Sequence, residues 1–310
     1  MFGGLILNYA SVIVTYNRKA LLLDAINSVL NQDNKPQKII LIDNNSNDGT
    51  RELIADSGLL DNKVFRYVRL PENIGGSGGF NVGVKLALEY DVDWISLSDD
   101  DAIFEQAYFS NISQKAKQNP DVKAFSGTIK LPNGRIQLDQ RNRITNWNYF
   151  SHNAVPEKEY GHDFCIDLFT FCGCVINVKL IKKIGLPHGD FFIWYDDIEY
   201  SLRVRQYSKI INVSNSVIVH HTKWVDVQTT YPADWREYYW IRNRTVAVRE
   251  RGRNRFVVNF WLVFFVPIMA IRILTKPMYK GKRKHALYVH FAGTRDAWLG
   301  RMGKNLKFVP

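Results

Sequence analysis

The chain has 310 residues, of which 46% are hydrophobic and 23% are charged, values that are ordinary for a soluble globular protein. Cys165, Cys172 and Cys174 are odd in number and clustered, which disfavours a disulfide framework and indicates a reducing compartment. Cys172-Gly-Cys174 alternates like a strand and predicts core packing; a zinc site, the alternative, would need more ligands nearby. The net charge is uneven: residues 236–310 hold 17 Lys and Arg against 3 Asp and Glu, or +14, whereas residues 1–235 hold −3. This asymmetry indicates an anionic surface as a partner of the C-terminal part alone.

The first 130 residues alternate between strand and helix patterns. Apolar runs at 11–15, 38–43, 64–70 and 92–97 predict strands, and helical stripes lie between them. This order predicts an α/β domain with a mainly parallel sheet and helices on both faces. In such sheets ligands bind beyond the carboxyl ends of the strands. The polar residues found at those ends are Thr15, Asn17, Arg18, Asp43, Asp99, Asp100 and Asp101.

Two stretches, VIVTYNRKALLLDAINSVLNQ and KIILIDNNSNDGT, resemble the opening of inverting family-2 glycosyltransferases, which have the GT-A fold. The segment SDDDA stands in the place of that family's Asp-x-Asp metal motif. The stretches NIGGSGGFNVG, WYDDIEYSLR and YYWIRN are most similar to bacterial galactofuranosyltransferases, and the last is also similar to rhamnosyltransferases. The resemblance implies a nucleotide-sugar donor, with Thr15, Asn17, Arg18 and Asp43 lining its pocket.

The three consecutive carboxylates predict a metal site. Oxygen ligands suit a hard cation such as Mn²⁺ or Mg²⁺, which would neutralise the leaving diphosphate. Adjacent side chains of an extended segment point to opposite sides, so Asp99 and Asp101 can share one ion while Asp100 lies nearer the substrates. The resemblance implies the same pair and adds a histidine ligand, for which we favour His220 and keep His221 as second choice. The alternative is a solvated acidic turn that caps a helix near Phe104.

The glycine-rich segment from Gly75 to Gly79 leaves backbone N–H groups free to approach a ligand. It lacks the third glycine of a dinucleotide fingerprint, and the chain has no P-loop motif. We therefore expect Gly75, Gly76 and Gly79, with Asn73 nearby, to shape the donor-sugar pocket. A plain flexible turn is the alternative.

A second acidic set, WYDDIEYSLR, predicts the general base that an inverting transfer requires. Asp197 aligns best with the base of the family it resembles, and Asp196 would position the acceptor or the base. Helix capping by both is the alternative. Trp194 and Tyr195 either stack on acceptor sugars or pack in the core, and Glu199 is free to pair with Arg203 four residues on.

The C-terminal part contains a 16-residue apolar stretch, 256–271, which is short for a bilayer span of about 20 residues. Basic residues flank both of its ends, so we expect an in-plane helix on an anionic leaflet or a helix buried in a homo-oligomer. Nucleic-acid binding is disfavoured, because no RNA-binding motif accompanies the charge.

These observations divide the chain into a nucleotide-sugar-binding half at 1–130, an acceptor-binding half at 131–235 and a basic helical region at 236–310. The resemblance implies a metal-dependent enzyme on the cytoplasmic face of the cell membrane. It would transfer galactofuranose from UDP-galactofuranose to a lipid-linked or growing surface polysaccharide, such as that of lipopolysaccharide. A dTDP-rhamnose-dependent rhamnosyltransferase and a non-catalytic glycan- or nucleotide-sugar-binding scaffold are the alternatives.

Overall fold

The computed structural model describes residues 7–222 and 234–309. Its strands are β1 (Tyr9–Thr15), β2 (Lys38–Asp43), β3 (Phe65–Arg69), β4 (Trp94–Asp99), β5 (Ala102–Phe104), β6 (Ala124–Lys130), β7 (Arg141–Asn146), β8 (Ser151–Ala154), β9 (Phe164–Ile166), β10 (Leu168–Phe169), β11 (Cys174–Asn177) and β12 (Ile210–His220). Its α-helices are α1 (Lys19–Leu30), α2 (Thr50–Asp56), α3 (Gly75–Ala87), α4 (Tyr108–Gln118), α5 (Val178–Ile184), α6 (Asp196–Arg205), α7 (Trp235–Arg251), α8 (Arg255–Thr275) and α9 (Arg283–Trp298). Short 3₁₀ turns are η1 (Leu59–Asp61), η2 (Leu138–Gln140), η3 (Glu157–Gly161), η4 (Gly189–Phe191) and η5 (Pro277–Tyr279).

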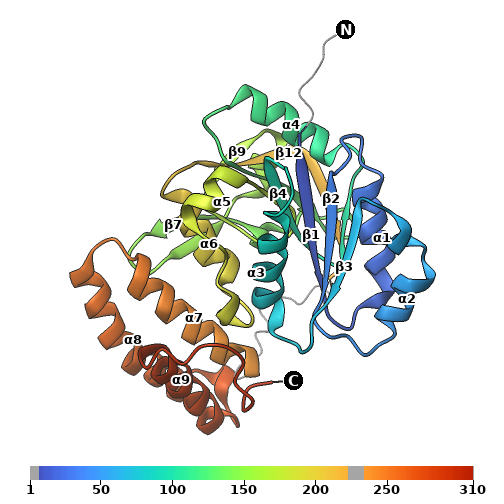
Figure 1. The fold of residues 1–310 in the computed structure, drawn as a ribbon. Helices are drawn as coiled ribbons and strands as arrows, with labels where there is room; N and C mark the ends of the chain where they lie inside the picture. Colours follow the sequence, from blue (N-terminus) through green and yellow to red (C-terminus); the bar gives the residue numbers. More distant parts are fainter. Residues whose placement is uncertain (1–6, 223–233, 310) are drawn as a thin grey trace.

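The main sheet has the strand order β3-β2-β1-β4-β11-β6-β12-β5, and β9 also pairs with β12 (Figure 1). The strands β3, β2, β1 and β4 are all parallel, whereas β11 runs antiparallel to both β4 and β6. The predicted mainly parallel sheet therefore describes the N-terminal half, and beyond β4 the sheet is mixed. A separate small sheet, β10-β7-β8, is antiparallel.

The period-2 alternation of β1 explains why helices cover both faces of the sheet. Val12 and Val14 point into the cluster that includes Phe80 and Val84 of α3. Tyr9 and Ile13 point into the opposite cluster, which α1 and α4 complete. The expected two-faced α/β arrangement is confirmed.

One local expectation, the glycine loop, and one alternative, the helix cap near Phe104, were wrong. The glycine-rich segment is the first part of α3 rather than a loop, because Gly79 and Gly83 let this helix pack directly on β1. A Cβ atom on Gly79 would lie 2.6 Å from Val14 Cγ1, and one on Gly83 would lie 2.2 Å from Val12 Cγ1. Near Phe104 the chain forms the short strand β5 and no helix, so the acidic run caps nothing there.

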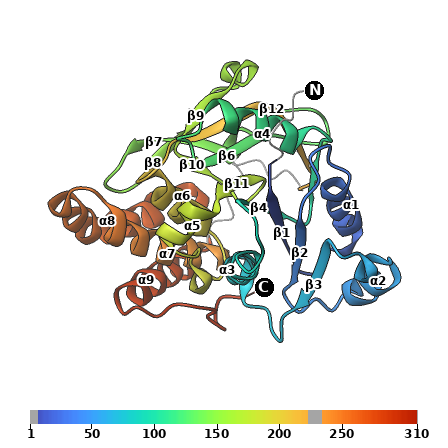
Figure 2. The same ribbon diagram turned by 45° about the horizontal axis from the view of Figure 1, so that its top comes forward.

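The basic C-terminal part folds into α7, α8 and α9, which lie beside α6 and on the side of α3 away from β1–β3 (Figures 1 and 2). Helix α8 has 21 residues, because its pattern continues from Arg255 to Thr275 through Pro267. It is long and apolar enough to cross a membrane, so the argument from a short 16-residue stretch was wrong.

Candidate active site

The acidic run lies where the carboxyl ends of β1, β4 and β12 meet. Thr15 Oγ1 donates to Asp100 Oδ2 at 2.6 Å, and Arg18 Nη1 donates to Asp101 Oδ2 at 2.6 Å. His220 Nε2 lies 3.1 Å from Asp101 Oδ1. A guanidinium and an imidazole therefore neutralise the repulsion that three adjacent carboxylates would otherwise create.

The electrostatics of the run are those of a crowded, buried acidic centre. Burial, and then the charge of Asp101, raises the pKa of Asp99 to about 7. Burial also raises the pKa of Asp100 to about 6, although Thr15 and Arg18 oppose it. Burial acts in the same direction on Asp101, but the hydrogen bond and charge of His220 outweigh it and lower that pKa. The same contact with Asp101 raises the pKa of His220 against its burial.

The structure brings His220, and not His221, to the acidic run. The His220 ring is fixed from behind, because Nδ1 lies 2.8 Å from Gln137 Oε1. His221 is exposed and offers only its backbone N–H, which donates to Asp101 O at 2.9 Å. Gln137 is a positioning residue that nothing in the sequence pattern distinguished.

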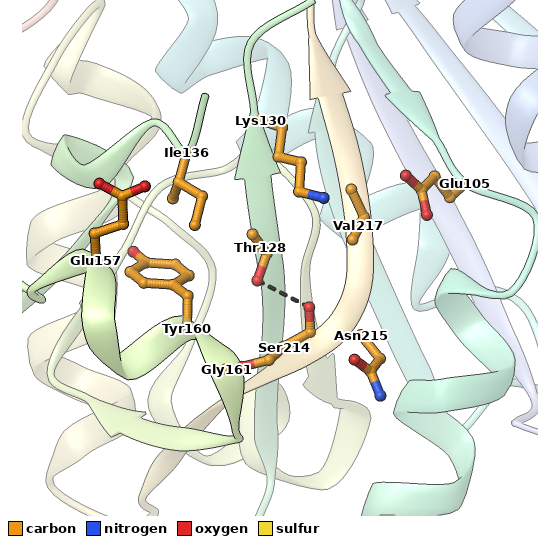
Figure 3. A pocket seen from close by; sticks show the side chains of 10 residues that line it. All are labelled: Glu105, Thr128, Lys130, Ile136, Glu157, Tyr160, Gly161, Ser214, Asn215 and Val217. Carbon is orange, nitrogen blue, oxygen red and sulfur yellow. Dashed lines mark hydrogen bonds between the residues drawn. The ribbon is translucent and has the colours of Figure 1, made fainter. Parts of the chain in front are cut away.

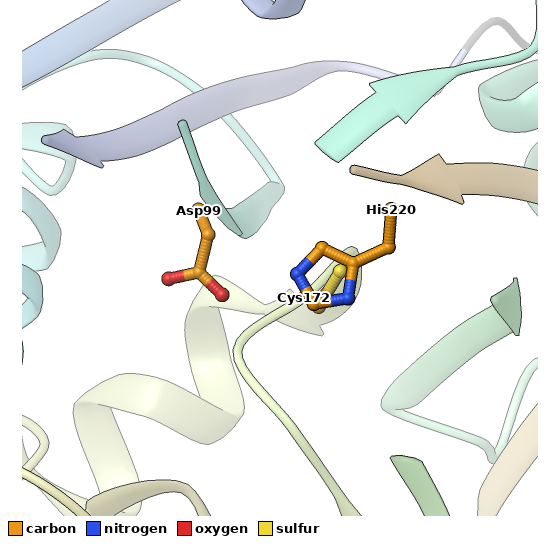
Figure 4. Close-up of side chains that lie close together, drawn as sticks. All are labelled: Asp99, Cys172 and His220. Carbon is orange, nitrogen blue, oxygen red and sulfur yellow. The ribbon is translucent and has the colours of Figure 1, made fainter. Parts of the chain in front are cut away.

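These residues fit a hard divalent cation. Two ligand atoms of an octahedral ion lie about 3 Å apart, given metal–oxygen bonds of about 2.1 Å, and Asp101 and His220 already present such a pair. Asp99, whose ionisation is disfavoured by burial, would regain its charge beside a cation. Cys172 also belongs to this centre: its Sγ and one ligand atom each of Asp99 and His220 lie within 4.8 Å of one another (Figure 4). The strand-like alternation of Cys172 and Cys174 had suggested core packing only.

The expected nucleotide residues differ in how they face the site. Asp43 is fully buried, and its oxygens accept from Ser46 N at 2.7 Å and Tyr67 Oη at 2.6 Å. Asn17, with a left-handed φ of 54°, accepts from Asn47 N at 2.8 Å. Both side chains therefore build the turn after β2 from inside, whereas Thr15 and Arg18 face the acidic run.

Of the two glycines that begin α3, the structure requires Gly75 and does not require Gly76. Gly75 has a φ of +81°, and a Cβ atom there would lie 1.9 Å from Phe192 O. Gly76 has no atom near such a Cβ, so it leaves open space at the helix N-terminus. Asn73 Oδ1 accepts from Gly75 N at 2.8 Å and fixes the approach of the chain to this turn. The first turn of α3 is thus packed directly against the segment that precedes Asp196.

Asp196 and Asp197 begin α6 after a strained turn. Phe192, Trp194 and Tyr195 all have left-handed φ values, of 67°, 64° and 72°. Burial raises the pKa of Asp196 to about 6. Burial, and then the charge of Asp196, raises the pKa of Asp197 well above its usual range, and Asp99 adds to this shift. The second acidic set therefore lies close enough to the first to interact with it.

Two buried residues of α7 hold that turn, and the sequence reasoning missed both. Asn243 Nδ2 donates to the carbonyl oxygens of Phe191, Ile193 and Trp194 at 3.0, 3.1 and 2.8 Å. Arg242 is fully buried and donates to Phe191 O at 2.9 Å and to Gly303 O at 2.6 Å. The signal was an Arg-Asn pair inside YYWIRN, on a face of α7 that is otherwise apolar.

The aromatic pair before the acids is divided between surface and core. Trp194 is 41% exposed, and the Arg236 guanidinium lies 5.7 Å from its ring centre. Tyr195 is 3% exposed and packs with Phe191 and Val246, so it is a core residue and cannot stack on a sugar. The expected pair of Glu199 and Arg203 is confirmed, with Arg203 Nε donating to Glu199 Oε2 at 2.9 Å.

A polar groove of about 510 Å³ lies along β6 and β12, and Figure 3 shows the residues that line it. Its lining includes Lys130, Glu105, Glu157 and Thr128, together with the 8%-exposed Tyr160. Among the described residues, the Tyr160 hydroxyl has no hydrogen-bond partner. Ile136 lines the groove, and the next residue, Gln137, contacts His220.

Comparison with known proteins identifies the family and the fold of the chain. Residues 11–183 match the family model described as "Glycosyl transferase family 2". The chain is 23% identical to galactofuranosyltransferase GlfT1 of Mycolicibacterium smegmatis over 82% of this chain and 87% of that protein. It is 21% identical to dTDP-rhamnosyl transferase RfbF of Shigella flexneri, over 78% and 80% of the two chains. Its structure resembles that of GalNAc-T7 with UDP, GalNAc and Mn²⁺, with a TM-score of 0.63 and 16% identity over 93% of this chain and 55% of that one. The expected GT-A fold is confirmed.

Proposed function

The chain belongs to glycosyl transferase family 2 and is a glycosyltransferase, and we propose that it transfers galactofuranose from UDP-galactofuranose to a hydroxyl of a cell-surface polysaccharide. The observation that carries this proposal is the convergence of two acidic sets, Asp99–Asp101 and Asp196–Asp197, at one end of the sheet. One set faces the leaving group and the other faces the attacking group. Similarity to a named galactofuranosyltransferase supports the sugar.

On the donor side, Asp99, Asp101 and His220 would hold Mn²⁺ or Mg²⁺, and the ion would supply positive charge to the diphosphate. Arg18 is 57% exposed in its side chain, so it is free to turn from Asp101 to a phosphate oxygen. Thr15 fixes Asp100, which then lies towards the sugar. The turn built by Asp43 and Asn17 forms the wall of the nucleoside pocket, and Asn73, Gly75, Gly76 and Gly79 shape the sugar pocket.

On the acceptor side, Asp197 takes the proton from the attacking hydroxyl. A carboxylate with a raised pKa suits this role, because a general base works best when its pKa lies near the operating pH. Charge on a bound cation at the first acidic set would favour the ionised form of Asp197. Asp196 positions the acceptor or the base, and Trp194 offers an exposed face to the acceptor sugar.

The rest of the acceptor fits the polar groove. Carboxylates, an amine and hydroxyls without ion pairs among the described residues are groups that bind neutral sugars. Most residues that line the groove lie within 131–235, and Glu105, Thr128 and Lys130 come from the first 130 residues.

The C-terminal helices dock the enzyme on the inner face of the cell membrane. Helix α8 packs on α7 and α9 through Val258, Leu262 and Phe265, and its other side is exposed and apolar. The exposed large side chains of this face are Phe256, Phe260, Val263, Phe264, Ile268, Ile271 and Leu274. Basic residues at both ends favour an in-plane helix on an anionic leaflet. An interface between copies of the chain is the other way to cover this face.

Vesicle binding tests the docking. Phe260→Glu with Ile271→Glu should weaken binding to vesicles of anionic phospholipid, whereas Leu60→Glu, which alters an equally exposed apolar residue of η1, should not. Binding should also fall steeply with salt, because exposed charges are screened. Equally strong binding to vesicles of neutral phospholipid would show that electrostatic attraction does not contribute to docking. Protection of the C-terminus from protease on the far side would show a membrane-spanning α8 instead.

A donor screen in the presence of Mn²⁺, scored by nucleotide release, tests the function. UDP-galactofuranose should be turned over in preference to dTDP-rhamnose. Similarity to RfbF makes dTDP-rhamnose the second candidate, and turnover of that donor alone would reverse the order. Binding of a nucleotide-sugar without any turnover would instead support the alternative function, that of a non-catalytic scaffold.

A further inference from the structure

The thiol of Cys172 is a donor at the acidic centre that the transfer reaction does not use. Cys172 is 1% exposed. Its Sγ atom and one ligand atom each of Asp99 and His220 all lie within 4.8 Å of one another (Figure 4). A thiol, an imidazole and a carboxylate are the ligands that proteins use for Zn²⁺. Asp101 Oδ1 lies 3.1 Å from His220 Nε2, beside this set of three donors.

The backbone around Cys172 is fixed on both sides. Arg141 Nη2 donates to Cys172 O at 3.1 Å, and the Tyr108 hydroxyl donates to Gly173 O. Gly173 has a φ of +80°, and a Cβ atom there would lie 2.1 Å from Ile218 Cδ1. The backbone at Cys172 is therefore held in place beside the centre.

Arg141 also places a positive charge beside the thiol. It is fully buried, and its hydrogen bonds reach neutral oxygens such as Gly127 O at 2.9 Å and Asn212 Oδ1 at 3.2 Å. The guanidinium favours the thiolate, but burial and then the charge of Asp99 outweigh it and raise the pKa of the Cys172 thiol well above its usual range. The thiol therefore loses its proton only when a metal ion binds to it.

Hard and soft metal ions are expected to use different donor atoms of this one centre. Mn²⁺ and Mg²⁺ prefer oxygen and gain little from sulfur, so they favour Asp99, Asp101 and His220. Zn²⁺ and Cd²⁺ bind thiolate strongly and are satisfied by four ligands. We propose that Asp99, Cys172 and His220 form a second, thiophilic donor set that takes Zn²⁺ or Cd²⁺ and thereby excludes the hard cation. On binding, the S–H bond breaks, the proton passes to buffer and a metal–sulfur bond forms, with no change of oxidation state.

Inhibition of sugar transfer by Zn²⁺ rests on the proposed function, whereas binding of Zn²⁺ or Cd²⁺ to the three residues does not. The direct test is the ultraviolet thiolate-to-Cd²⁺ charge-transfer band of the full chain, titrated without donor or acceptor. All measurements use the Cys165→Ser background, because Cys165 is an exposed thiol that would add its own signal. Cys172→Ser should abolish the band. Cys174→Ser is the matched control, because this thiol is also buried but lies outside the donor set.

The second test measures how strongly Zn²⁺ inhibits sugar transfer in the presence of Mn²⁺. The Zn²⁺ concentration for half-inhibition should rise at least about tenfold in Cys172→Ser, since even indirect partners of a metal ligand change affinity by 10–100-fold. Asp99→Asn, which keeps the thiol, should also weaken the Cd²⁺ band. No band, or a band that survives in Cys172→Ser, would overturn the proposal. A band that requires Cys172 in a protein without Mn²⁺-dependent transfer would uphold it and reject the metal requirement of the proposed function.

Discussion

Replacing Asn243 should slow turnover without weakening donor binding. Its amide donates to the carbonyls of Phe191, Ile193 and Trp194 in the turn that positions Asp196 and Asp197. Phe191 O keeps the Arg242 guanidinium as a donor, so Asn243→Ala leaves the partly buried carbonyls of Ile193 and Trp194 without this amide, at about 1–2 kcal/mol each. The resulting loss of about 2–4 kcal/mol corresponds to roughly 4–16 °C in Tm. A displacement of the base by about 1 Å would lower turnover about 10²-fold.

Three measurements on one preparation check this reasoning. Differential scanning fluorimetry gives Tm, calorimetry gives the affinity for the donor nucleotide, and nucleotide release gives turnover. Asn243→Asp keeps the shape but removes the donors, so it should behave like the alanine variant. Asn62→Ala, which removes one hydrogen bond to Val64 N beside η1, is the control with unchanged turnover. Normal turnover at a lowered Tm would make Asn243 a structural residue only, and an unchanged Tm would refute the hydrogen-bond accounting itself.

Asp197→Asn should lower turnover by about 10²–10⁴-fold with little change in donor affinity, and near-normal turnover would move the base to Asp196 or Asp100. Asp99→Ala, Asp101→Ala or excess EDTA should abolish transfer, and full activity in any of these would reject the metal site. Below the pKa of Asp99, about 7, a proton competes with the metal, so affinity for Mn²⁺ should fall about tenfold per pH unit. The pKa of Asp99 in the folded protein lies above the ordinary aspartate value of 3.8, so Asp99 stabilises the metal-free protein at low pH and loses that contribution as pH rises through 7. Mn²⁺ should therefore raise Tm more at pH 8 than at pH 6, and equal shifts would contradict this. Gly75→Ala should cost at least about 1–2 kcal/mol and reduce activity, because its φ is left-handed and its Cβ would strike Phe192 O, whereas Gly76→Ala should be tolerated.

Order along the chain and hydrophobic period were sufficient for the N-terminal half of this protein. Strand ends in a parallel sheet gather at one edge, so the sequence could place Thr15, Arg18 and Asp99 together before any coordinates were known. These features depend on local pattern and on a topology with few alternatives.

The sequence could not decide contacts that join distant segments. The glycines of α3 read as a loop because their close approach to β1 and to Phe192 exists only after the helix packs. Asp43 read as a free carboxylate, although its partner Tyr67 lies on the neighbouring strand.

Cys172 and Asn243 show which features only the tertiary structure could reveal. Alternation identified Cys172 as buried, but burial alone does not say which polar groups share the space, and those groups come from β4 and β12. Asn243 acts on a turn about 50 residues away, through carbonyl groups that every residue possesses and that therefore leave no trace in the sequence. Local chemistry determined which groups this protein carries, and long-range packing decided which of them meet.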